Sequence, residues 1–340
     1  SSAASDVYKR QNGQAAVHVV IIGFANNASN KLKYIYSAEG VSKKAQNINP
    51  YLIDAPNVLV AARTKPINNV PQITYGNKPT DNGNFLLTEE EMERLVKEDN
   101  SLTNIIKRYV SSKDFINNNE KRYCLWLKNV QPAIYRKNKF IMKRLEAIKE
   151  FRLNSTAAPT RQMADKPYLF FSAPQTENDY LCIPETSSEK RRYIPIGFMN
   201  KDIIASNAML IIPNASIYHF GILTSNIHMS WMRMIAGRLE MRYRYSGSTV
   251  YNNFPWPNPP EAQKKAIEKT AQAILDARAL YPQSSLADLY DETTMPPELR
   301  RAHRANDKAV MQAYGFWGKL NSETEAVAEL MKMYQRLTNN

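Results

Sequence analysis

The chain has 340 residues, of which 45 are Lys or Arg and 32 are Asp or Glu, giving a formal net charge of +13. At about 100–200 residues per domain, this length predicts two or three domains. The longest apolar stretch, residues 15–25, is shorter than the about 20 apolar residues that a membrane span needs. Two cysteines, Cys124 and Cys182, are too few for a disulfide framework or a four-ligand zinc site. We therefore expect a folded cytoplasmic protein without membrane contact, whose basic surface suits a polyanion.

The first eleven residues, Ser1–Gln11, differ in composition from the rest of the chain. They contain the string DVYKRQ, which resembles the translation of a sequencing adapter. They lack the apolar segment of a signal peptide. We expect the biological sequence to begin near Asn12 and the native protein to continue upstream of it. A disordered native terminus is the alternative.

Three strands are expected in the next fifty residues. Ala15–Phe24 is apolar and β-branched, which predicts a buried strand. Lys31–Ser37 alternates between apolar and polar residues, which predicts a half-exposed strand. Val58–Arg63 is a third, short candidate.

The middle of the chain mixes short helices and strands. Thr88 and Glu91 have the spacing of a capping box and predict a helix over 89–97. Ser101–Val110 is a second helix candidate, and Asn138–Phe151 predicts a basic amphipathic helix. Short strands are expected at Tyr123–Leu127, Tyr168–Phe171, Tyr180–Ile183, Ile194–Phe198 and Ala208–Ile212. This mixture indicates an α+β domain.

The last third of the chain is helical in pattern. Apolar spacing predicts a helix within Gly221–Leu239. Beyond Pro255–Pro260, three amphipathic helices are expected over Glu261–Tyr281, Pro297–Tyr314 and Ser322–Leu337. We expect them to form a small bundle that packs against the preceding domain or spaces it.

The positive charge lies upstream of that proline-rich break. Residues 258–340 hold 11 basic and 11 acidic residues, whereas Lys121–Arg152 holds ten basic residues against Glu146 and Glu150. Aromatic residues alternate with the cations there, which suits contact with a nucleic-acid backbone. The other interpretation is a solvated face whose aromatic residues belong to the core. Backbone contacts are expected from Lys137, Lys139, Lys143 and Arg144.

The search for catalytic motifs is negative. No Gly-rich phosphate loop is present, and Asn258-Pro259-Pro260 only begins like the NPP-aromatic motif of amino-methylating enzymes, because Glu261 stands where the aromatic residue belongs. His219 and His228 lack a third ligand at metal-site spacing, so we expect them, like the two cysteines, to be packed. No catalytic, cofactor-binding or metal residue is predicted in this chain.

Two basic motifs are candidates for nucleic-acid contact. Arg191 and Arg192 precede a strand-like segment, where they suit phosphate binding or contact with a base edge, and a plain surface turn is the alternative. The segment 237–246 follows an apolar helix. If it is extended, Glu240, Arg242 and Arg244 share one side, and arginine can pair with guanine while Glu accepts from cytosine. An exposed salt bridge is the alternative. In this segment, contacts to the nucleic-acid backbone are expected from Arg238 and Arg244.

At this point the residues resemble a known family. Residues 246–257 end in YNNFPWP, which is similar to a signature of the MmeI-type adenine-specific DNA methyltransferases, often fused restriction–modification enzymes. Six further segments follow the family's order: HVVIIGF at His18–Phe24, RYCLWL at Arg122–Leu127, SSEKRRYIPIGF at Ser187–Phe198, FGILTSNIHMSWMR at Phe220–Arg233, SLADLYDETTMPPELRRAH at Ser285–His303 and AVMQAYG at Ala309–Gly315.

The resemblance implies three parts and a function. Residues 12–47 would be the last strands of a Rossmann-like methyltransferase domain, 48–257 a mixed α+β target recognition domain, and 258–340 a C-terminal helical domain. The chain would read double-stranded DNA for an S-adenosyl-L-methionine-dependent adenine-N6 methyltransferase whose cofactor and catalytic motifs lie upstream. This chain alone would then bind no cofactor and be inactive. The family's base-contacting positions match Glu240 and Arg242, and a further one falls near Ala208.

Two alternatives remain at this stage. One is a stand-alone DNA specificity subunit that partners a separate methyltransferase. The other is an RNA-binding or protein-interaction module built around the neutral helices.

Overall fold

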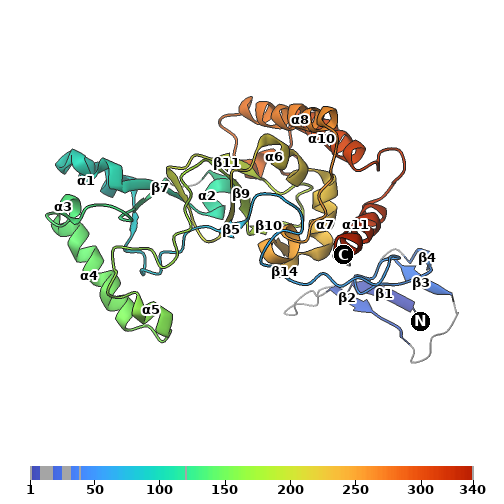
Figure 1. Ribbon diagram of the computed structural model, residues 1–340, viewed down its shortest axis with the longest axis horizontal. Coiled ribbons are helices and arrows are strands. Elements are labelled where there is room, and N and C mark those ends of the chain that lie inside the picture. Colours follow the sequence, from blue (N-terminus) through green and yellow to red (C-terminus); the bar gives the residue numbers. More distant parts are fainter. Residues whose placement is uncertain (1, 8–17, 25–31, 38–39, 119–120, 339–340) are drawn as a thin grey trace.

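The computed structural model describes residues 2–7, 18–24, 32–37, 40–118 and 121–338. They form a mixed α+β protein with several sheets and a helical C-terminal part, which confirms the predicted fold class. Figure 1 shows a lobe of helices and short strands at one end and the C-terminal helices at the other, with the N-terminal sheet below those helices. Among the described helices, none is both long and apolar enough to cross a bilayer.

The N-terminal part forms a four-stranded sheet. In spatial order its strands are β2 (His18–Ile21), β1 (Ser2–Val7), β3 (Lys33–Tyr36) and β4 (Ser42–Ala45), with β1 parallel to β3 and the other pairs antiparallel. The half-exposed strand predicted over 31–37 is confirmed by β3. The burial predicted for 15–24 is wrong at β2, where Val20 and Ile21 are 55% and 50% exposed, because β2 is an edge strand.

The first eleven residues, which differ in composition from the rest of the chain, contribute to this sheet, since β1 covers residues 2–7. Residues 8–17 lie outside the described residues. The adapter origin of the first eleven residues therefore stays a prediction.

The segment between this sheet and residue 71 is held by side chains of the signature segment. Val58 and Val60 are buried, but the strand predicted over 58–63 is wrong, because side chains instead of a partner strand bind its carbonyl groups. The buried Asn253 donates from Nδ2 to the Ala61 carbonyl at 2.9 Å, and Asn252 donates to the Arg63 carbonyl at 2.8 Å. These asparagines precede the FPWP string and follow a π-helical turn, η2 (Gly247–Tyr251). The signature therefore has a structural role.

The lobe, residues 79–170, has its own hydrophobic core, formed by residues such as Phe85, Leu125 and Ile141. Its elements are β6 (Leu86–Leu87), α1 (Glu89–Glu98), η1 (Asn100–Ile105), β7 (Ile106–Val110), α2 (Ser112–Asn117), β8 (Arg122–Leu125), α3 (Pro132–Tyr135), α4 (Lys139–Leu153) and α5 (Ala158–Gln162). The capping box of Thr88 and Glu91 is confirmed. The helix predicted over 101–110 is wrong in its second half, because β7 lies between β8 and β12 (Ile203–Ala205).

One buried arginine joins three parts of this lobe. Arg152 has no exposed surface, and its five N–H groups donate to the carbonyls of Pro79, Thr80, Met163, Lys166 and Leu169 at 2.8–3.1 Å. The strand predicted over 168–171 is wrong, since this segment turns around the guanidinium. Burial lowers the pKa of Arg152, and Asp81 opposes this shift.

The central sheet contains β11 (Gly197–Met199), β9 (Tyr180–Pro184), β13 (Met209–Pro213) and β5 (Thr74–Tyr75), in this spatial order. The neighbouring strands in it pair antiparallel. The strands expected near 180–183 and 208–212 are confirmed, and the one expected over 194–198 begins three residues later. All five residues of β9 are buried, which fits its place between two partners.

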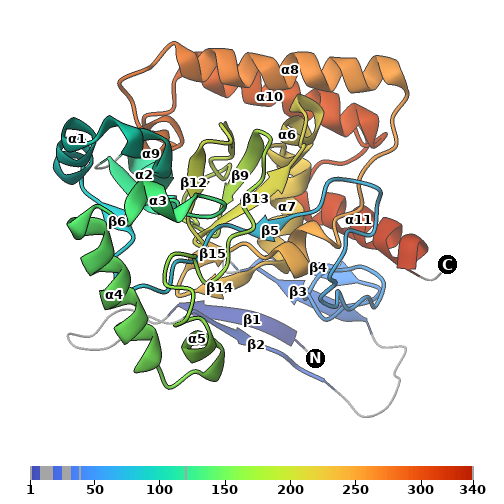
Figure 2. The ribbon, with the colours of Figure 1, turned by 60° about the vertical axis from the view of Figure 1, so that its left-hand side comes forward.

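The helical part shares one core with the central sheet. The helix predicted within 221–239 is split into α6 (Ile217–Leu223) and α7 (Asn226–Ile235), because Ser225 caps the second one. The three predicted C-terminal helices are confirmed as α8 (Glu261–Ala279), α10 (Pro297–Ala313) and α11 (Glu323–Thr338), with a short α9 (Leu286–Leu289). Helix α8 lies beside α10 in both views and packs on α6, while α11 packs on α7 (Figures 1 and 2). One cluster of buried residues runs from Ile53 to Tyr334. The helices therefore pack onto the preceding region and do not act as a separate spacer.

Candidate nucleic-acid interface

A β-hairpin carries the residues that the sequence assigned to base reading. Strands β14 (Gly237–Leu239) and β15 (Arg242–Arg244) pair antiparallel, with Leu239 opposite Arg242 and Gly237 opposite Arg244. A third strand, β10 (Thr186–Ser187), pairs with the other edge of β15. Figure 2 shows this ribbon between the lobe and the C-terminal helices.

The hairpin has one buried and one exposed face. Successive strand residues point to opposite faces, and Tyr243 is buried in the main core. Arg242 and Arg244 therefore share the exposed face, as predicted. Glu240 departs from the prediction, because it lies in the two-residue turn with φ +57° instead of continuing the strand. The turn nevertheless places its carboxylate next to Arg242.

Two ion pairs hold the exposed side chains of this face. Arg242 Nη2 lies 2.9 Å from Glu240 Oε2, and both side chains are exposed. Arg244 Nε lies 3.0 Å from Glu185 Oε1, and this hydrogen bond raises the pKa of Arg244. The exposed salt bridge that the sequence offered as an alternative is thus present. Such a pair is worth about 0–1 kcal/mol, so it positions the two groups without locking them.

The base of the hairpin is fixed by buried polar contacts. Tyr245, the residue after β15, is fully buried, and its hydroxyl lies 2.9 Å from His228 Nε2 on α7. On the other face, the Arg238 guanidinium stacks over the Tyr243 ring at 3.8 Å and donates to the Met241 carbonyl. The exposed tip thus stands on a rigid support.

The arginine pair before β11 faces the helical part instead. Burial lowers the pKa of the half-buried Arg191, and the carboxylate of Asp291 opposes this. Arg192 lies over the Tyr193 ring at 5.6 Å, and Tyr193 raises its pKa, with a smaller effect from Asp307. The acidic neighbours of both arginines belong to the helical part of the chain.

The basic helix α4 contains two kinds of cation. Lys139 and Lys143 are exposed and four residues apart, so they share a helix face, and Lys137 is exposed just before them. Arg144 is instead half-buried and bound to the protein. It donates to the carbonyls of Asn84 and Leu86 and forms a 2.6 Å ion pair with Glu91. Its guanidinium is engaged in joining α4 to α1.

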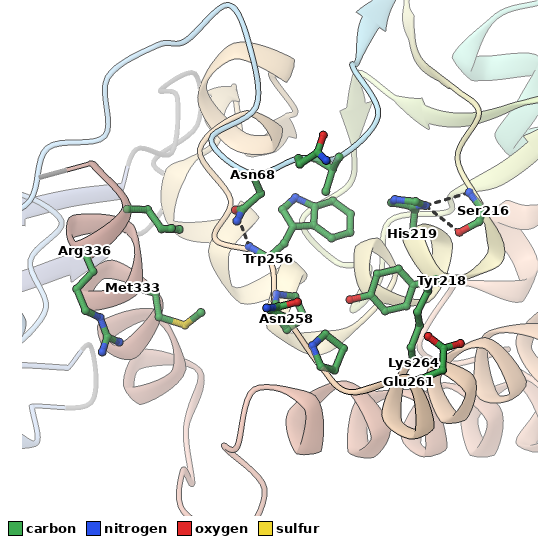
Figure 3. A pocket seen from close by; sticks show the side chains of 15 residues that line it. Asn68, Ser216, Tyr218, His219, Trp256, Asn258, Glu261, Lys264, Met333 and Arg336 are labelled. Carbon is green, nitrogen blue, oxygen red and sulfur yellow. Dashed lines mark hydrogen bonds between the residues drawn. The ribbon is translucent and has the colours of Figure 1, made fainter. Parts of the chain in front are cut away.

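A cavity of about 810 Å³ lies between the signature segment, α6, α8 and α11 (Figure 3). Figure 3 shows Trp256 and Tyr218 beside it and His219 turned toward Ser216. His219 Nδ1 accepts a hydrogen bond from the Ser216 backbone N–H at 3.0 Å and caps α6. Burial lowers the pKa of His219 to about 4. The imidazole is therefore neutral and has a structural role.

The remaining candidates for metal or nucleophile chemistry are packed, as predicted. Cys124 and Cys182 are completely buried, and burial raises the pKa of both thiols. Burial also lowers the pKa of His228 to about 3. In the part of the chain that the structure describes, no group of three His, Cys, Asp or Glu side chains is arranged to hold a metal ion. The residues of the NPP string lead into α8, as the helix pattern indicated.

Sequence reasoning missed three features of the hairpin. Glu185 comes from a distant segment, so only the fold reveals its pairing with Arg244. Leu239 and Met241 are apolar, yet 45% and 47% exposed at the tip. Their polar context, with a charge on every second position, was the only signal in the sequence that they leave the core.

The comparisons with known proteins agree with this architecture. The family model for the MmeI target recognition domain matches residues 54–258, and that for the MmeI C-terminal domain matches 259–340. DNA methyltransferase A of Bacillus subtilis (strain 168) is 39% identical over 324 residues, which cover 95% of this chain and 36% of that protein. A solved structure of the type IIL restriction–modification enzyme MmeI in complex with DNA has 47% sequence identity and a TM-score of 0.89, and the match covers 100% of this chain and 46% of that one.

The chain thus spans between about a third and a half of the length of these relatives. The two family models together match residues 54–340. The chain therefore belongs to the MmeI family and contains that family's target recognition and C-terminal domains.

Proposed function

We propose that this chain is the DNA-reading part of an adenine-specific DNA methyltransferase and that the β14–β15 hairpin reads a base pair. The observation that carries the proposal is the exposed, adjacent pair of Glu240 and Arg242 at the tip of a two-stranded ribbon. The major groove admits such a ribbon, where arginine pairs with guanine O6 and N7 and Glu accepts from cytosine N4. A relative with 47% identity has been solved with DNA, which supports duplex DNA as the partner.

The ion pair between these residues favours this role over a purely structural one. At 47% and 77% exposure, Arg242 and Glu240 contribute little to stability through their salt bridge. Opening it therefore costs little when each group finds a partner on a G·C pair. The pair also keeps the arginine fork extended beside the carboxylate before DNA arrives.

Contacts to the DNA backbone are assigned to the cations that remain exposed. These are Lys137, Lys139 and Lys143 on the lobe, with Arg238 and Arg244 on the hairpin. They provide sequence-independent attraction. Arg144 is excluded from this set because its guanidinium is bound to Glu91 and two carbonyls. Arg191 and Arg192 are left out of this set, because acidic groups of the helical part already attract them: Asp291 acts on Arg191, and Asp307 and Glu292 act on Arg192.

Methyl transfer belongs, in this proposal, to the part of the protein outside this chain. The Bacillus subtilis relative is a DNA methyltransferase of which the chain covers 36%. S-adenosyl-L-methionine would supply the methyl group for the N6 of a flipped adenine there. We assign no residue of this chain to the cofactor. We therefore expect no methyl transfer when the chain is incubated with labelled S-adenosyl-L-methionine and duplex DNA.

The test is selection of binding sites from a randomised duplex library by the purified chain and by Arg242→Ala. We expect the wild-type chain to select a consensus. The variant should lose about 1–3 kcal/mol on that site and accept other bases at one position. Arg301→Ala is the matched control, since Arg301 is an exposed, ion-paired arginine on α10. It should leave both affinity and consensus unchanged.

Two outcomes contradict the proposal. Equal weakening by Arg242→Ala on all sequences would mean that Arg242 holds the backbone and reads no base. Tighter binding to RNA or single strands than to duplex DNA, measured by competition, would favour an RNA-binding module instead. Salt dependence alone does not separate these possibilities, because every polyanion binder shows it.

A further inference from the structure

The hairpin tip combines two features that lower the stability of the free chain. Glu240 adopts φ +57°, a left-handed conformation that costs a residue with a side chain about 1–2 kcal/mol. Its neighbours Leu239 and Met241 are apolar and about half exposed. Two-residue hairpin turns ordinarily hold Asn, Asp and Gly. An exposed Leu-Glu-Met tip is therefore better explained by a contact made outside the chain.

The strand register defines which of these apolar side chains lies on the same face as Arg242. Leu239 lies directly opposite Arg242, so both point to the exposed face, and side chains opposed in this way are about 4.5–5.5 Å apart at Cβ. One base-pair step rises about 3.4 Å, so two side chains at this spacing can reach neighbouring base pairs. Gly237, on the same face, has open space where a Cβ would be, so the backbone there is free to approach a ligand closely.

An apolar side chain has one distinctive target in the major groove. Each base pair presents hydrogen-bonding groups there, but only thymine adds a methyl group at C5. Leu239 carries no donor or acceptor on its side chain and lies opposite Arg242 in the last residue pair before the turn. It therefore suits this methyl group and no hydrogen-bonding edge.

We infer that Leu239 is a specificity-determining residue, which contacts the 5-methyl group of a thymine beside the base pair contacted by Glu240 and Arg242. This inference depends on the proposed function, because it requires the hairpin to lie in the major groove. It extends that function from a charged pair to an apolar contact. It also accounts for the exposure of a leucine at the tip.

The experiment replaces thymine by deoxyuridine, one position at a time, in the duplex that the wild-type chain selects. We expect one replacement, next to the position that Arg242→Ala relaxes, to weaken binding by about fourfold, which corresponds to about 0.8 kcal/mol for one buried carbon group. Leu239→Ala should bind the two duplexes equally, while Leu239→Met should keep the preference for thymine. Leu280→Ala is the control, since Leu280 is a 64% exposed leucine at the end of α8.

The possible failures are distinguishable. A consensus that depends on Arg242 but tolerates deoxyuridine everywhere, or a methyl preference that survives Leu239→Ala, overturns the role of Leu239 alone. A wild-type chain that selects no consensus overturns the proposed function as well. Equal melting temperatures of the variants and the wild type would show that the binding changes do not come from unfolding.

Discussion

The buried Arg152 offers the sharpest test of how the lobe is held together. Its five N–H groups are all used, and each donates to a backbone carbonyl at 2.8–3.1 Å. The acceptors lie in two chain segments, residues 79–80 and 163–169, which α4 joins through this one side chain. No carboxylate accepts from the guanidinium among the hydrogen bonds of the described residues, so the carbonyl oxygens stabilise its charge.

The magnitude follows from counting donors. Arg152→Met keeps much of the apolar stem but leaves five carbonyl groups without their donor. We expect a loss of about 5 kcal/mol, since each unmade buried hydrogen bond costs at least about 1 kcal/mol. Arg152→Lys keeps the charge and at most three donors in a different geometry. We expect this variant to lose about 2 kcal/mol, since an unmade buried hydrogen bond costs about 1–3 kcal/mol.

The assay is urea unfolding, followed by hydrogen exchange of the two acceptor segments. Loss of protection should appear first at the N–H groups of Lys166, Leu169 and Phe171, which donate to carbonyls of the two acceptor segments, and should spare the main core. Arg161→Ala is the matched control, because the exposed Arg161 also donates to two carbonyls, those of Ser155 and Thr156. A surface change of this kind costs at most about 0.5 kcal/mol. Equal losses for the Met and Lys variants, or a loss no larger than that of Arg161→Ala, would refute the donor count.

Two further predictions concern the main core. Gly221→Ala would place a Cβ 2.7 Å from Ile267 Cγ2 and 2.9 Å from Ala271 Cβ. Urea unfolding should therefore show that the free energy of unfolding falls by about 1–3 kcal/mol. A neutral effect would mean that α6 and α8 can separate freely. Burial lowers the pKa of His228 to about 3 in the folded chain. Between pH 6.5 and pH 3, His228 is therefore protonated in the unfolded chain and neutral in the folded chain. Its contribution to stability is thus complete above pH 6.5 and falls by about 1.4 kcal/mol per pH unit toward pH 3. His228→Gln should make the measured pH profile shallower by that amount, and an unchanged slope would contradict the assignment.

Local signals in the sequence predicted the helices well. The helix after Thr88 begins where the capping box places it. Both capping hydrogen bonds join Thr88 and Glu91, which are only three positions apart in the sequence. The helix pattern of 261–281 and 297–314 likewise needed no distant partner to be recognised. Short range in the chain is what made these elements predictable.

Elements that depend on distant partners were predicted less well. Residues 106–110 form a strand because β8 and β12 flank them, and β12 is almost a hundred residues away. In residues 58–63, Val58 and Val60 are buried but no strand forms, since Asn253 and Asn252 bind the carbonyl groups of Ala61 and Arg63. The spacing of apolar residues indicates which positions are buried. It does not indicate which groups form hydrogen bonds with the backbone.

The candidate site shows the same division. The segment that carries Glu240 and Arg242 could be located by its charges and by the apolar helix before it. Its geometry could not, since the turn at Glu240 depends on the pairing of β14 with β15 and on the anchoring of Tyr245 by His228. The exposure of Leu239 at the tip follows from that register, and the alternating charges around it are its only local signal.

Net charge is therefore an incomplete guide to the surface that we propose for DNA contact. Three of the four arginines between residues 121 and 152 are bound within the protein: Arg122 to Asp114, Arg144 to Glu91, and Arg152 to carbonyl groups. A planar guanidinium with five donors suits such sites, whereas the lysines of α4 keep a point charge in solvent. In the hairpin the arrangement is reversed, because Arg242 and Arg244 are exposed and pair with the carboxylates of Glu240 and Glu185. In the function proposed above, the lobe attracts any duplex and the hairpin distinguishes one sequence from another.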